Sequence, residues 1–491
     1  MDGEFTKTIN KKIEEVGNKT IHFIRNYLVP MLQEFLQGIS NMLTLLIDIL
    51  KTKDHSYKAS FTSYDEVLFK YNKGFCLDGR RCLARSQPNA IIMAPSGAGK
   101  TTCVVTPTLL KADANFIIND PSGEIATHTV GHLESIGYEI KYINFSDATV
   151  SNGYNPMARI KNGADANKIA HLLVRSVMGS NVNDPFWSIQ SVNIISLMIK
   201  ALLFEDTEYQ NFANVRHLIQ LQSANPKIVD ALIVRTGSEE LINDYKSFLS
   251  FDVKLRTSIQ ATCLAALQIF SDPTVAKVTS IDTLNIDDIR KGKQAIFIHC
   301  NTADMKYYST LISIFFEQIT KVVMSKIPEE DDRYVFFILD ELSNLYLPTL
   351  QITAANIRKY KGNLLLILQS MNQLIDVYGK MEADAIRTNC FAKMYFAGLD
   401  HYTASELSQQ LGKYEWIDEE TGKKSIRELA TADEVRILPR DKAILICGNH
   451  NPMKLQLTPY YNNPFLKLRA QIPAISINGK LDEEEVELLN E

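Results

Sequence analysis

A glycine-rich stretch at residues 94–102 constrains the fold of this chain more than any other feature. It follows the apolar residues 90–93 and precedes a helical pattern. Such a turn between a strand and a helix leaves backbone N–H groups free to surround a phosphate. The pattern therefore predicts that Lys100 contacts the β- and γ-phosphates of a nucleotide and that the Thr101 hydroxyl binds Mg²⁺. The pattern usually begins with glycine, and we expect the small side chain of Ala94 to serve equally well. The predicted nucleotide-binding residues are Ala94, Pro95, Ser96, Gly97, Ala98, Gly99, Lys100, Thr101 and Thr102.

A second stretch supplies the acidic residues that such a site needs. Residues 335–339 form a continuous apolar run, which is typical of a strand buried on both faces, and Asp340 and Glu341 follow it directly. Ligands bind at the carboxyl ends of parallel strands. We therefore expect Asp340 to hold the Mg²⁺ shell and Glu341 to be the catalytic base that aligns a water on the γ-phosphate. Either stretch alone is compatible with an ordinary turn, but the pair favours a nucleotide site.

Length and composition narrow the class of protein. A chain of 491 residues is too long for one small core, so we expect two or three structural units. The net charge of −5 gives no overall sign of a nucleic-acid binder, so any DNA contact is expected to be local. Seven scattered cysteines favour a reducing compartment. The sequence shows neither a signal peptide nor an apolar run of about 20 residues, and we expect a cytoplasmic protein without a transmembrane segment.

Residues 1–60 are predicted to form an amphipathic helical N-terminal region. Apolar residues recur between Leu28 and Leu50 at steps of three and four, which is the period of a helix, and Pro30 is expected to kink or divide it. In one interpretation the region packs on the body of the protein or on a partner helix. In the other it lies on a membrane surface. The polar face carries few clustered lysines, which favours the first interpretation.

The rest of the chain first alternates strand and helix signals and then changes character. The alternation predicts a mostly parallel sheet with flanking helices. Between the two halves of this pattern the periodicity is helical, which predicts an all-α domain at residues 162–290 inserted into a nucleotide-binding domain of residues 61–161 and 291–465. Residues 466–491 are expected to form a mobile acidic C-terminal tail. Strands are expected at residues 90–93, 116–118, 140–145, 295–298, 335–339, 364–368, 392–396 and 443–447.

The order of these elements favours one group of nucleotide-binding folds. At least one strand lies between the phosphate-loop strand and the Asp340 strand, and Glu341 directly follows the metal-binding aspartate. These traits describe a RecA-like P-loop ATPase core better than a small GTPase or a nucleotide kinase. RecA-like motor ATPases form rings in which the nucleotide lies between subunits, so a neighbouring copy can insert an arginine into the site.

Several further stretches match the motifs of one family in order and spacing. They are Asn-Asp-Pro-Ser-Gly-Glu at 119–124, Tyr-Asn-Pro at 154–156, Asp-Pro-Phe-Trp at 184–187, Leu-Asp-Glu-Leu-Ser-Asn-Leu at 339–345 and Leu-Gln-Ser-Met-Asn-Gln-Leu at 368–374. With the phosphate loop, they make the chain resemble the type IV secretion coupling proteins, the TraG/TraD-like conjugative ATPases of the HerA–FtsK superfamily. The resemblance runs from about Gly74 to about Tyr461.

This resemblance implies a function and a set of partners. It implies hydrolysis of ATP with Mg²⁺ by a homohexamer that delivers DNA, without sequence preference, or a relaxase–DNA or protein substrate to the components of a type IV secretion channel. In such proteins the inserted domain faces the cytosol and is thought to meet the relaxosome or secreted substrates. Typical members carry transmembrane helices before the motor domain. This chain shows only the amphipathic region, so we expect peripheral recruitment to the inner face of the cell membrane.

The resemblance also assigns roles to two further residues. Gln369 resembles the polar sensor that contacts the γ-phosphate or the attacking water. Arg358 resembles the arginine that acts in trans in a neighbouring site, although residues 358–361 are also compatible with a solvated helix end. The remaining alternatives for the whole chain are another HerA–FtsK-type DNA or protein translocase, or a recruitment platform that nucleotide merely holds together.

Two weaker features accompany these motifs. Glu124, His128 and His132 have the four-residue spacing of metal ligands on a helix, but we expect both histidines to face solvent. Asp120 and Glu124 are candidates for ordering Mg²⁺ or for coupling the site to a neighbour.

Overall fold

The computed structural model describes residues 57–87, 89–179, 185–300, 302–417, 422–474, 481 and 486–490, together with Leu36. The predicted amphipathic region, residues 1–60, lies outside the described residues except at Leu36, which is helical, and at residues 57–60. The chain divides into two compact units. One comprises Met1–Lys58 with Lys413–Arg427, and the other comprises Ala59–Gly412 with Glu428–Glu491.

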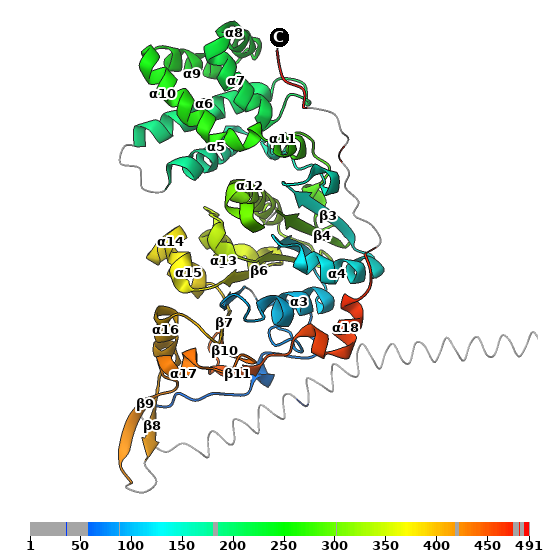
Figure 1. The fold of residues 1–491 in the computed structure, drawn as a ribbon, viewed down its shortest axis with the longest axis vertical. Coiled ribbons are helices and arrows are strands. Elements are labelled where there is room, and N and C mark those ends of the chain that lie inside the picture. The colour runs from blue at the N-terminus through cyan, green and yellow to red at the C-terminus, as the bar shows by residue number, and fades with distance from the viewer. Residues whose placement is uncertain are drawn as a thin grey trace, which may run out of the picture. The chain divides into compact units, whose positions relative to one another are not determined.

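The larger unit is built on a nine-stranded sheet with the strand order β11-β10-β7-β1-β6-β5-β2-β4-β3. From β7 to β3 all neighbours are parallel, whereas β10 is antiparallel to both β7 and β11. The predicted α/β fold with a mostly parallel sheet is confirmed (Figure 1). The strands are β1 (Ala90–Met93), β2 (Asn115–Asn119), β3 (Glu139–Asn144), β4 (Gln294–His299), β5 (Val335–Leu339), β6 (Gly362–Leu368), β7 (Ala392–Phe396), β10 (Lys442–Cys447) and β11 (Met453–Gln456).

The apolar runs explain why these strands form. Every residue of β1, β2, β5 and β6 is buried, as expected for strands covered by helices on both faces. All eight strands expected from the sequence have a counterpart in the sheet. The strand that the sequence analysis missed, β11, has four residues that alternate between buried and exposed at the sheet edge. So short an alternating segment gives little periodic signal.

Strand β6 lies between the phosphate-loop strand β1 and the strand β5 that ends before Asp340. The register pairs Met93 of β1 with Leu368 of β6, and Leu339 of β5 with Leu366 of β6. The carboxyl ends of all three strands therefore meet at one edge of the sheet. This intervening strand is the arrangement expected of a RecA-like fold.

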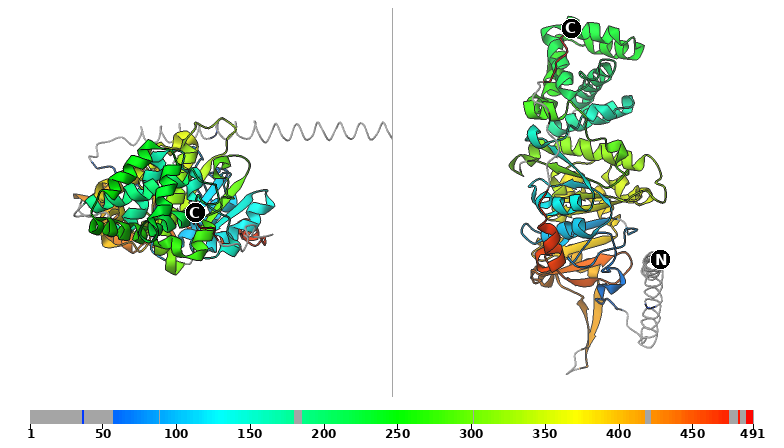
Figure 2. Two further views of the ribbon diagram at one scale, coloured as in Figure 1. Left: turned by 90° about the horizontal axis from the view of Figure 1, so that it is seen from above. Right: turned by 90° about the vertical axis from the view of Figure 1, so that its right-hand side faces the viewer.

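Helices cover both faces of the sheet and also form a separate group between β3 and β4. This group comprises α5–α11, which Figure 1 and the right-hand view of Figure 2 both place beyond the β3–β4 end of the sheet. The boundaries 162 and 290 of an inserted domain stay a prediction. The helices are α3 (Thr106–Lys111), α4 (Glu124–Ser135), α5 (Gly163–Met178), α6 (Pro185–Leu202), α7 (Phe212–Ala224), α8 (Pro226–Arg235), α9 (Glu239–Leu249), α10 (Val253–Ala266), α11 (Pro273–Val278), α12 (Met305–Met324), α13 (Leu350–Asn356), α14 (Met371–Tyr378), α15 (Lys380–Thr388), α16 (His401–Leu411), α17 (Ala432–Arg436) and α18 (Pro464–Ala470).

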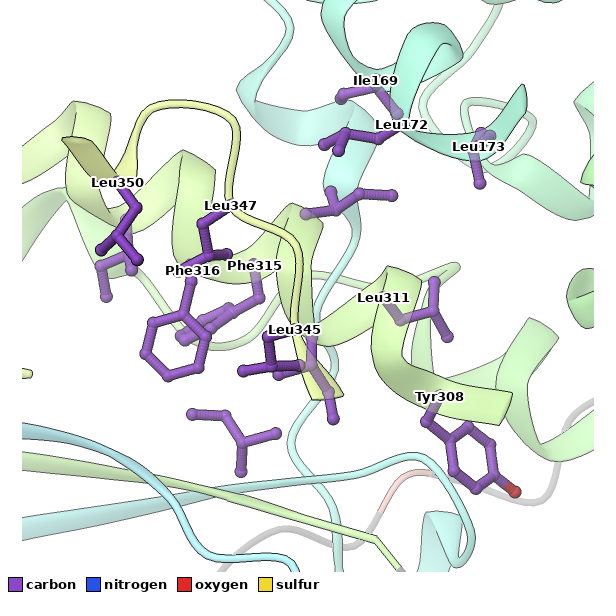
Figure 3. Packing of buried hydrophobic residues seen from close by; sticks show 14 of the residues in the cluster. Ile169, Leu172, Leu173, Tyr308, Leu311, Phe315, Phe316, Leu345, Leu347 and Leu350 are labelled. Atoms are coloured by element: carbon purple, nitrogen blue, oxygen red, sulfur yellow. The ribbon is translucent and has the colours of Figure 1, made fainter. Parts of the chain in front are cut away.

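A continuous apolar core joins the helical group to the sheet. Figure 3 shows Phe315 and Phe316 of α12 beside Leu345 and Leu347, which belong to the segment that follows Asp340 and Glu341. Leu172 of α5 packs into the same cluster. Each fully buried side chain of this size contributes about 1.5–3 kcal/mol. The segment after the acidic pair is therefore held in place by the same packing that anchors the first helix of the helical group.

The smaller unit contains a two-stranded sheet, β8 (Lys413–Ile417) with β9 (Lys424–Glu428). Lys58 forms a β-bridge with Tyr414, and Glu415 donates its backbone N–H to the Tyr57 carbonyl at 3.3 Å. Across the described part of the chain, the helices are too short or too polar for a bilayer-spanning segment. All seven cysteines are described and carry free thiols.

Two expectations about exposed segments differ from the structure. His132 of α4 is buried rather than solvent-facing, because α18 packs against α4. Residues 486–490, expected to be mobile, lie against α7, where Leu489 is buried. In both cases the covering segment is remote in the sequence, so local periodicity could not reveal it.

Candidate nucleotide-binding site

The loop after β1 adopts the backbone geometry that its two glycines allow. Gly97 and Gly99 have φ angles of 72° and 89°, which side chains with a Cβ rarely adopt. Ala94 has no positive φ and is fully buried, so this position requires a small residue and not a glycine. The Ala94 N–H donates to the Leu368 carbonyl at 2.9 Å, which fastens the start of the loop to the end of β6. Ser96 and Gly97 are exposed at the tip of the loop.

The helix after the loop begins with a π-helical turn, Thr101–Val105, before α3. Such turns are frequent at functional sites. The Cys103 N–H donates to the Gly99 carbonyl at 2.8 Å, and the Thr102 hydroxyl donates to the same carbonyl at 3.2 Å. These bonds hold the loop against the start of the helix. Thr101, the predicted Mg²⁺-binding hydroxyl, is half-buried at this turn.

Lys100 and Asp340, which are far apart in the sequence, lie side by side. The Lys100 Nζ atom is 3.7 Å from the Asp340 Oδ1 atom, and both side chains are largely buried, at 12% and 13% exposed. Burial raises the pKa of Asp340, the Lys100 ammonium lowers it, and the Glu341 carboxylate raises it further. The site therefore contains a buried carboxylate whose ionised form a nearby cation stabilises.

Glu341 occupies a strained position beside this pair. Its φ of 57° and ψ of 45° are left-handed, which costs a residue with a Cβ about 1–2 kcal/mol. Its N–H donates to Asp340 Oδ1 at 3.1 Å, and its Oε2 accepts from the Asn344 side-chain amide at 3.3 Å. Backbone strain of this kind clusters at active sites.

Three further polar residues lie at the same edge of the sheet. Asp120 is buried and accepts the Ala126 N–H at 2.7 Å, and burial raises its pKa to about 6. The Asn119 amide donates to the Asp340 carbonyl at 2.7 Å. A ring nitrogen of His299, at the end of β4, lies 3.2 Å from the Asp120 carbonyl. The sequence makes Asp120 a candidate, whereas Asn119 and His299 are not among the predicted site residues, although each directly follows a predicted strand.

Gln369 and Arg358, the other two predicted catalytic residues, lie at opposite ends of β6. Gln369 follows β6 directly, is half-buried, and donates its N–H to Gln373 Oε1 at 3.2 Å. Arg358 is exposed in the 3₁₀-helix Ile357–Tyr360, which precedes the amino end of β6. A seven-residue strand is about 20 Å long, so Arg358 is remote from Lys100 of its own chain. The structure thus places Lys100, Asp340, Glu341 and Gln369 at the carboxyl edge of the sheet. Arg358 lies at the opposite, amino edge.

The segment after Glu341 is fastened to three helices. The Thr349 N–H and hydroxyl donate to the two carboxylate oxygens of Glu317 on α12, at 3.0 and 2.8 Å. The Leu347 N–H donates to the Tyr378 hydroxyl of α14 at 3.0 Å. The guanidinium of Arg175 on α5 stacks over the Tyr346 ring at 3.6 Å. Any movement of the backbone at Glu341 therefore acts on packed elements rather than on a free loop.

The donor set at this edge suits Mg²⁺. This ion prefers oxygen ligands and usually binds through one or two carboxylates, with water and substrate phosphates completing its shell. Asp340 offers a largely buried carboxylate beside Lys100, and Thr101 offers a hydroxyl at the first position of the π-helical turn. The residues present therefore fit the ion that a nucleotide would bring. Across the described residues there is no cluster of three or more His, Cys, Asp or Glu side chains able to hold a metal, including at His128 and His132.

The fold and this site define a RecA-like protein with a P-loop nucleotide-binding site. The family model described as type IV secretory system conjugative DNA transfer matches residues 48–483, and the chain belongs to that family. Protein VirD4 of Rhizobium rhizogenes is 22% identical over 467 residues, covering 87% of this chain and 68% of VirD4. Conjugal transfer protein TraG of Agrobacterium fabrum is 24% identical over 405 residues, covering 77% of this chain and 60% of TraG.

A solved structure shares the fold. The plasmid coupling protein TrwB, in complex with ADP and Mg²⁺, matches with a TM-score of 0.64 and 18% sequence identity. The match covers 83% of this chain and 97% of the TrwB chain. The RecA-like architecture predicted from the order of the motifs is confirmed, as is the predicted membership in the coupling-protein family.

Proposed function

We propose that this chain is an ATP-hydrolysing coupling protein that moves DNA, or a DNA–protein conjugate, towards a type IV secretion channel. The observation that carries the proposal is the 3.7 Å approach of Lys100 to Asp340 at the carboxyl edge of the sheet. It supplies a cation for phosphates and a carboxylate for Mg²⁺ within one site of a family that performs conjugative DNA transfer. The ADP and Mg²⁺ bound by TrwB support the same cofactors here.

The chemistry that we assign to the site is positioning and charge neutralisation. The loop residues 94–102 hold the phosphates through backbone N–H groups, and the Lys100 ammonium neutralises the β- and γ-phosphates. Mg²⁺, when bound through Asp340 and Thr101, would neutralise phosphate charge as the γ-phosphate leaves. Glu341 accepts a hydrogen bond from the attacking water and orients it in line with the γ-phosphate. Gln369 contacts the same water or the γ-phosphate.

We further propose that the active form is a homohexamer in which Arg358 acts on a neighbouring copy. Arg358 is exposed and lies at the amino end of β6, so it is too far away to reach Lys100 of its own chain. An arginine that stabilises transferred phosphate from a neighbouring chain needs this exposure. Its loss is expected to lower turnover by about 10³-fold or more.

The proposed partners follow from family membership. A relaxase bound to DNA, or a secreted protein, would be the cargo, and channel components would be the recipients. We place the chain at the cytoplasmic face of the membrane, where such a channel opens. The helical group α5–α11 is the proposed meeting point with the cargo.

Two variants test the nucleotide site. Lys100→Ala is expected to abolish ATP hydrolysis, because it removes the cation that holds the β- and γ-phosphates. Glu341→Gln is expected to retain nucleotide binding while turnover falls by at least about 10²-fold, because an amide cannot accept the proton from water. Hydrolysis of Mg-ATP and binding of a fluorescent ATP analogue are measured for both. Undiminished hydrolysis by Lys100→Ala would refute the site.

Two further measurements separate the motor from its alternatives. DNA, rather than a protein cargo, should stimulate hydrolysis if the substrate is DNA, and stimulation by protein alone would favour a protein translocase. In a transfer assay between cells, Glu341→Gln should fail. If it still supports transfer while deletion of residues 162–290 does not, the chain is a recruitment platform instead.

A further inference from the structure

Residues 486–490 lie along the first turns of α7 in the helical group, beside the chain end marked in Figure 1. The Asn214 side chain donates to the Glu487 carbonyl at 2.9 Å and accepts the Leu489 N–H at 2.8 Å. His217, one turn further along α7, lies 3.1 Å from Asn490 Oδ1. Three residues of this segment, Glu487, Leu489 and Asn490, are thus placed by contacts to a single helix. We call the contacting surface of α7 the Asn214 surface, defined by Asn214 and His217.

Asn214 recognises the main chain of the segment rather than its side chains. One amide group satisfies a carbonyl and an N–H two residues apart, which is how a side chain grips an extended peptide. Asn214 is completely buried, and its amide also contacts Asn211 Oδ1 at 3.3 Å, so its orientation is fixed. A buried amide left without these partners would cost about 1–3 kcal/mol. The surface is therefore built to hold a peptide backbone.

Leu489 anchors the segment by burying its side chain, whereas the neighbouring Leu488 stays exposed. Leu489 is 5% exposed and belongs to the main apolar core, whereas Leu488 is 39% exposed. Burying a leucine contributes about 1.5–3 kcal/mol. The recognised pattern is an extended segment with one leucine in the pocket and its backbone on Asn214.

Charge opposes this docking. The Tyr209 hydroxyl donates to Glu487 Oε1 at 3.4 Å, and the pKa of Tyr209 is raised by burial and then by the carboxylates of Glu487, Glu208 and Asp206. The acidic segment therefore lies next to acidic residues of the helical group. The contacts of the backbone with Asn214 and the burial of Leu489 hold the segment in place against this repulsion.

We propose that the Asn214 surface is a peptide-binding site for an extended segment of a partner protein, whose backbone binds Asn214 and whose leucine takes the buried position of Leu489. Residues 486–490 of the chain itself occupy this site and must leave before the partner segment binds. Residues 471–485 join the segment to α18, so it stays tethered and competes at a high effective concentration after release. Tethers of this kind give effective concentrations in the mM range. The site is thus controlled by self-occupancy.

The test is peptide binding, measured by fluorescence polarisation. The assay contains no nucleotide, so a negative result would refute the peptide site without bearing on the proposed ATP hydrolysis. The probe is a labelled peptide with the sequence of residues 481–491. Deletion of residues 486–491, or Leu489→Asp, should strengthen probe binding by about tenfold or more, because the internal competitor is lost. The matched control Leu488→Asp alters an exposed leucine and should bind the probe like the unaltered chain. Adding Asn214→Ala to the deletion should abolish binding.

Two results would overturn the proposal. One is equal probe affinity for the full chain and the chain lacking residues 486–491. The other is no binding to the shortened chain while amide exchange shows that α7 is as protected as in the full chain. The exchange measurement separates loss of the site from loss of the fold.

Discussion

His132 lies on α4 against α18, and burial with the nearby Arg469 guanidinium lowers the pKa of its imidazole to about 4. The folded state therefore favours the neutral ring. The ordinary pKa of histidine is about 6.5, so the stabilisation is complete above that pH and is lost as the pH falls towards 4. Arg469 also donates to the Leu110 carbonyl at 2.5 Å, which keeps its charge near the ring.

We predict that His132 makes the protein sensitive to mild acid. Between pH 7 and pH 5 the unaltered chain should lose about 2 kcal/mol more unfolding free energy than His132→Gln, because glutamine does not titrate. His128→Gln, a half-exposed neighbour on the same helix, is the control and should behave like the unaltered chain. Denaturant unfolding at the two pH values measures the difference. An identical acid loss in His132→Gln would contradict the assignment.

At the scale of an element, α4 and the segment after α18 approach so closely that Gly131 is required. A Cβ at Gly131 would lie 2.0 Å from the Ile472 carbonyl oxygen and 2.7 Å from Pro473 backbone carbon. Both contacts are to backbone, which cannot rotate away. The helix interior would otherwise favour alanine over glycine by about 1 kcal/mol.

Gly131→Ala is therefore expected to destabilise the protein by about 2 kcal/mol or more, against its helix propensity. Gly163→Ala at the start of α5 is the matched control, because its Cβ would meet only the flexible end of Lys200 at 3.0 Å. That variant should change the unfolding free energy by less than about 1 kcal/mol. Denaturant midpoints compare the two. If Gly131→Ala proves neutral or stabilising, the packing of the 471–474 segment on α4 is wrong.

The elements also show how far sequence reasoning reaches. Short apolar runs bounded by turn residues indicated the central strands, because strands buried on both faces read as continuous apolar runs. The phosphate loop and the Asp340–Glu341 pair were recognisable because few chemistries need those residue types after a strand. Asn119 and His299 carry no such signature, and only the register of β2, β4 and β5 brings them to the same edge. The burial of His132 by α18 and the contact of Asn214 with Leu489 each join segments hundreds of positions apart in the sequence. Local periodicity does not encode such contacts.

On the scale of the whole molecule, one copy of the chain holds only part of the proposed catalytic site. Lys100, Asp340 and Glu341 lie at the carboxyl edge of the sheet, and Arg358 lies beyond the amino end of β6. A single copy therefore cannot place all four residues on one nucleotide. In the proposed ring, the phosphate site of one copy and Arg358 of the next would form a complete site.

This division predicts that two inactive variants restore each other. Lys100→Ala lacks the phosphate site but keeps Arg358, and Arg358→Ala lacks the arginine but keeps the phosphate site. In a mixed ring, the loop of the second variant can receive the arginine of the first. Every other interface in the mixed ring lacks Lys100, Arg358 or both, and stays inactive. The mixture should therefore recover only a fraction of the full rate.

Mg-ATP hydrolysis by this mixture, compared with each variant alone, tests the central claim most directly. We expect Lys100→Ala alone to be inactive, Arg358→Ala alone to fall by about 10³-fold or more, and the mixture to regain a rate far above the sum of the two. Native mass measurement of the same samples confirms that mixed rings have formed. A mixture as inactive as its components despite mixed rings, or an Arg358→Ala variant with the full rate by itself, would contradict a site shared between copies.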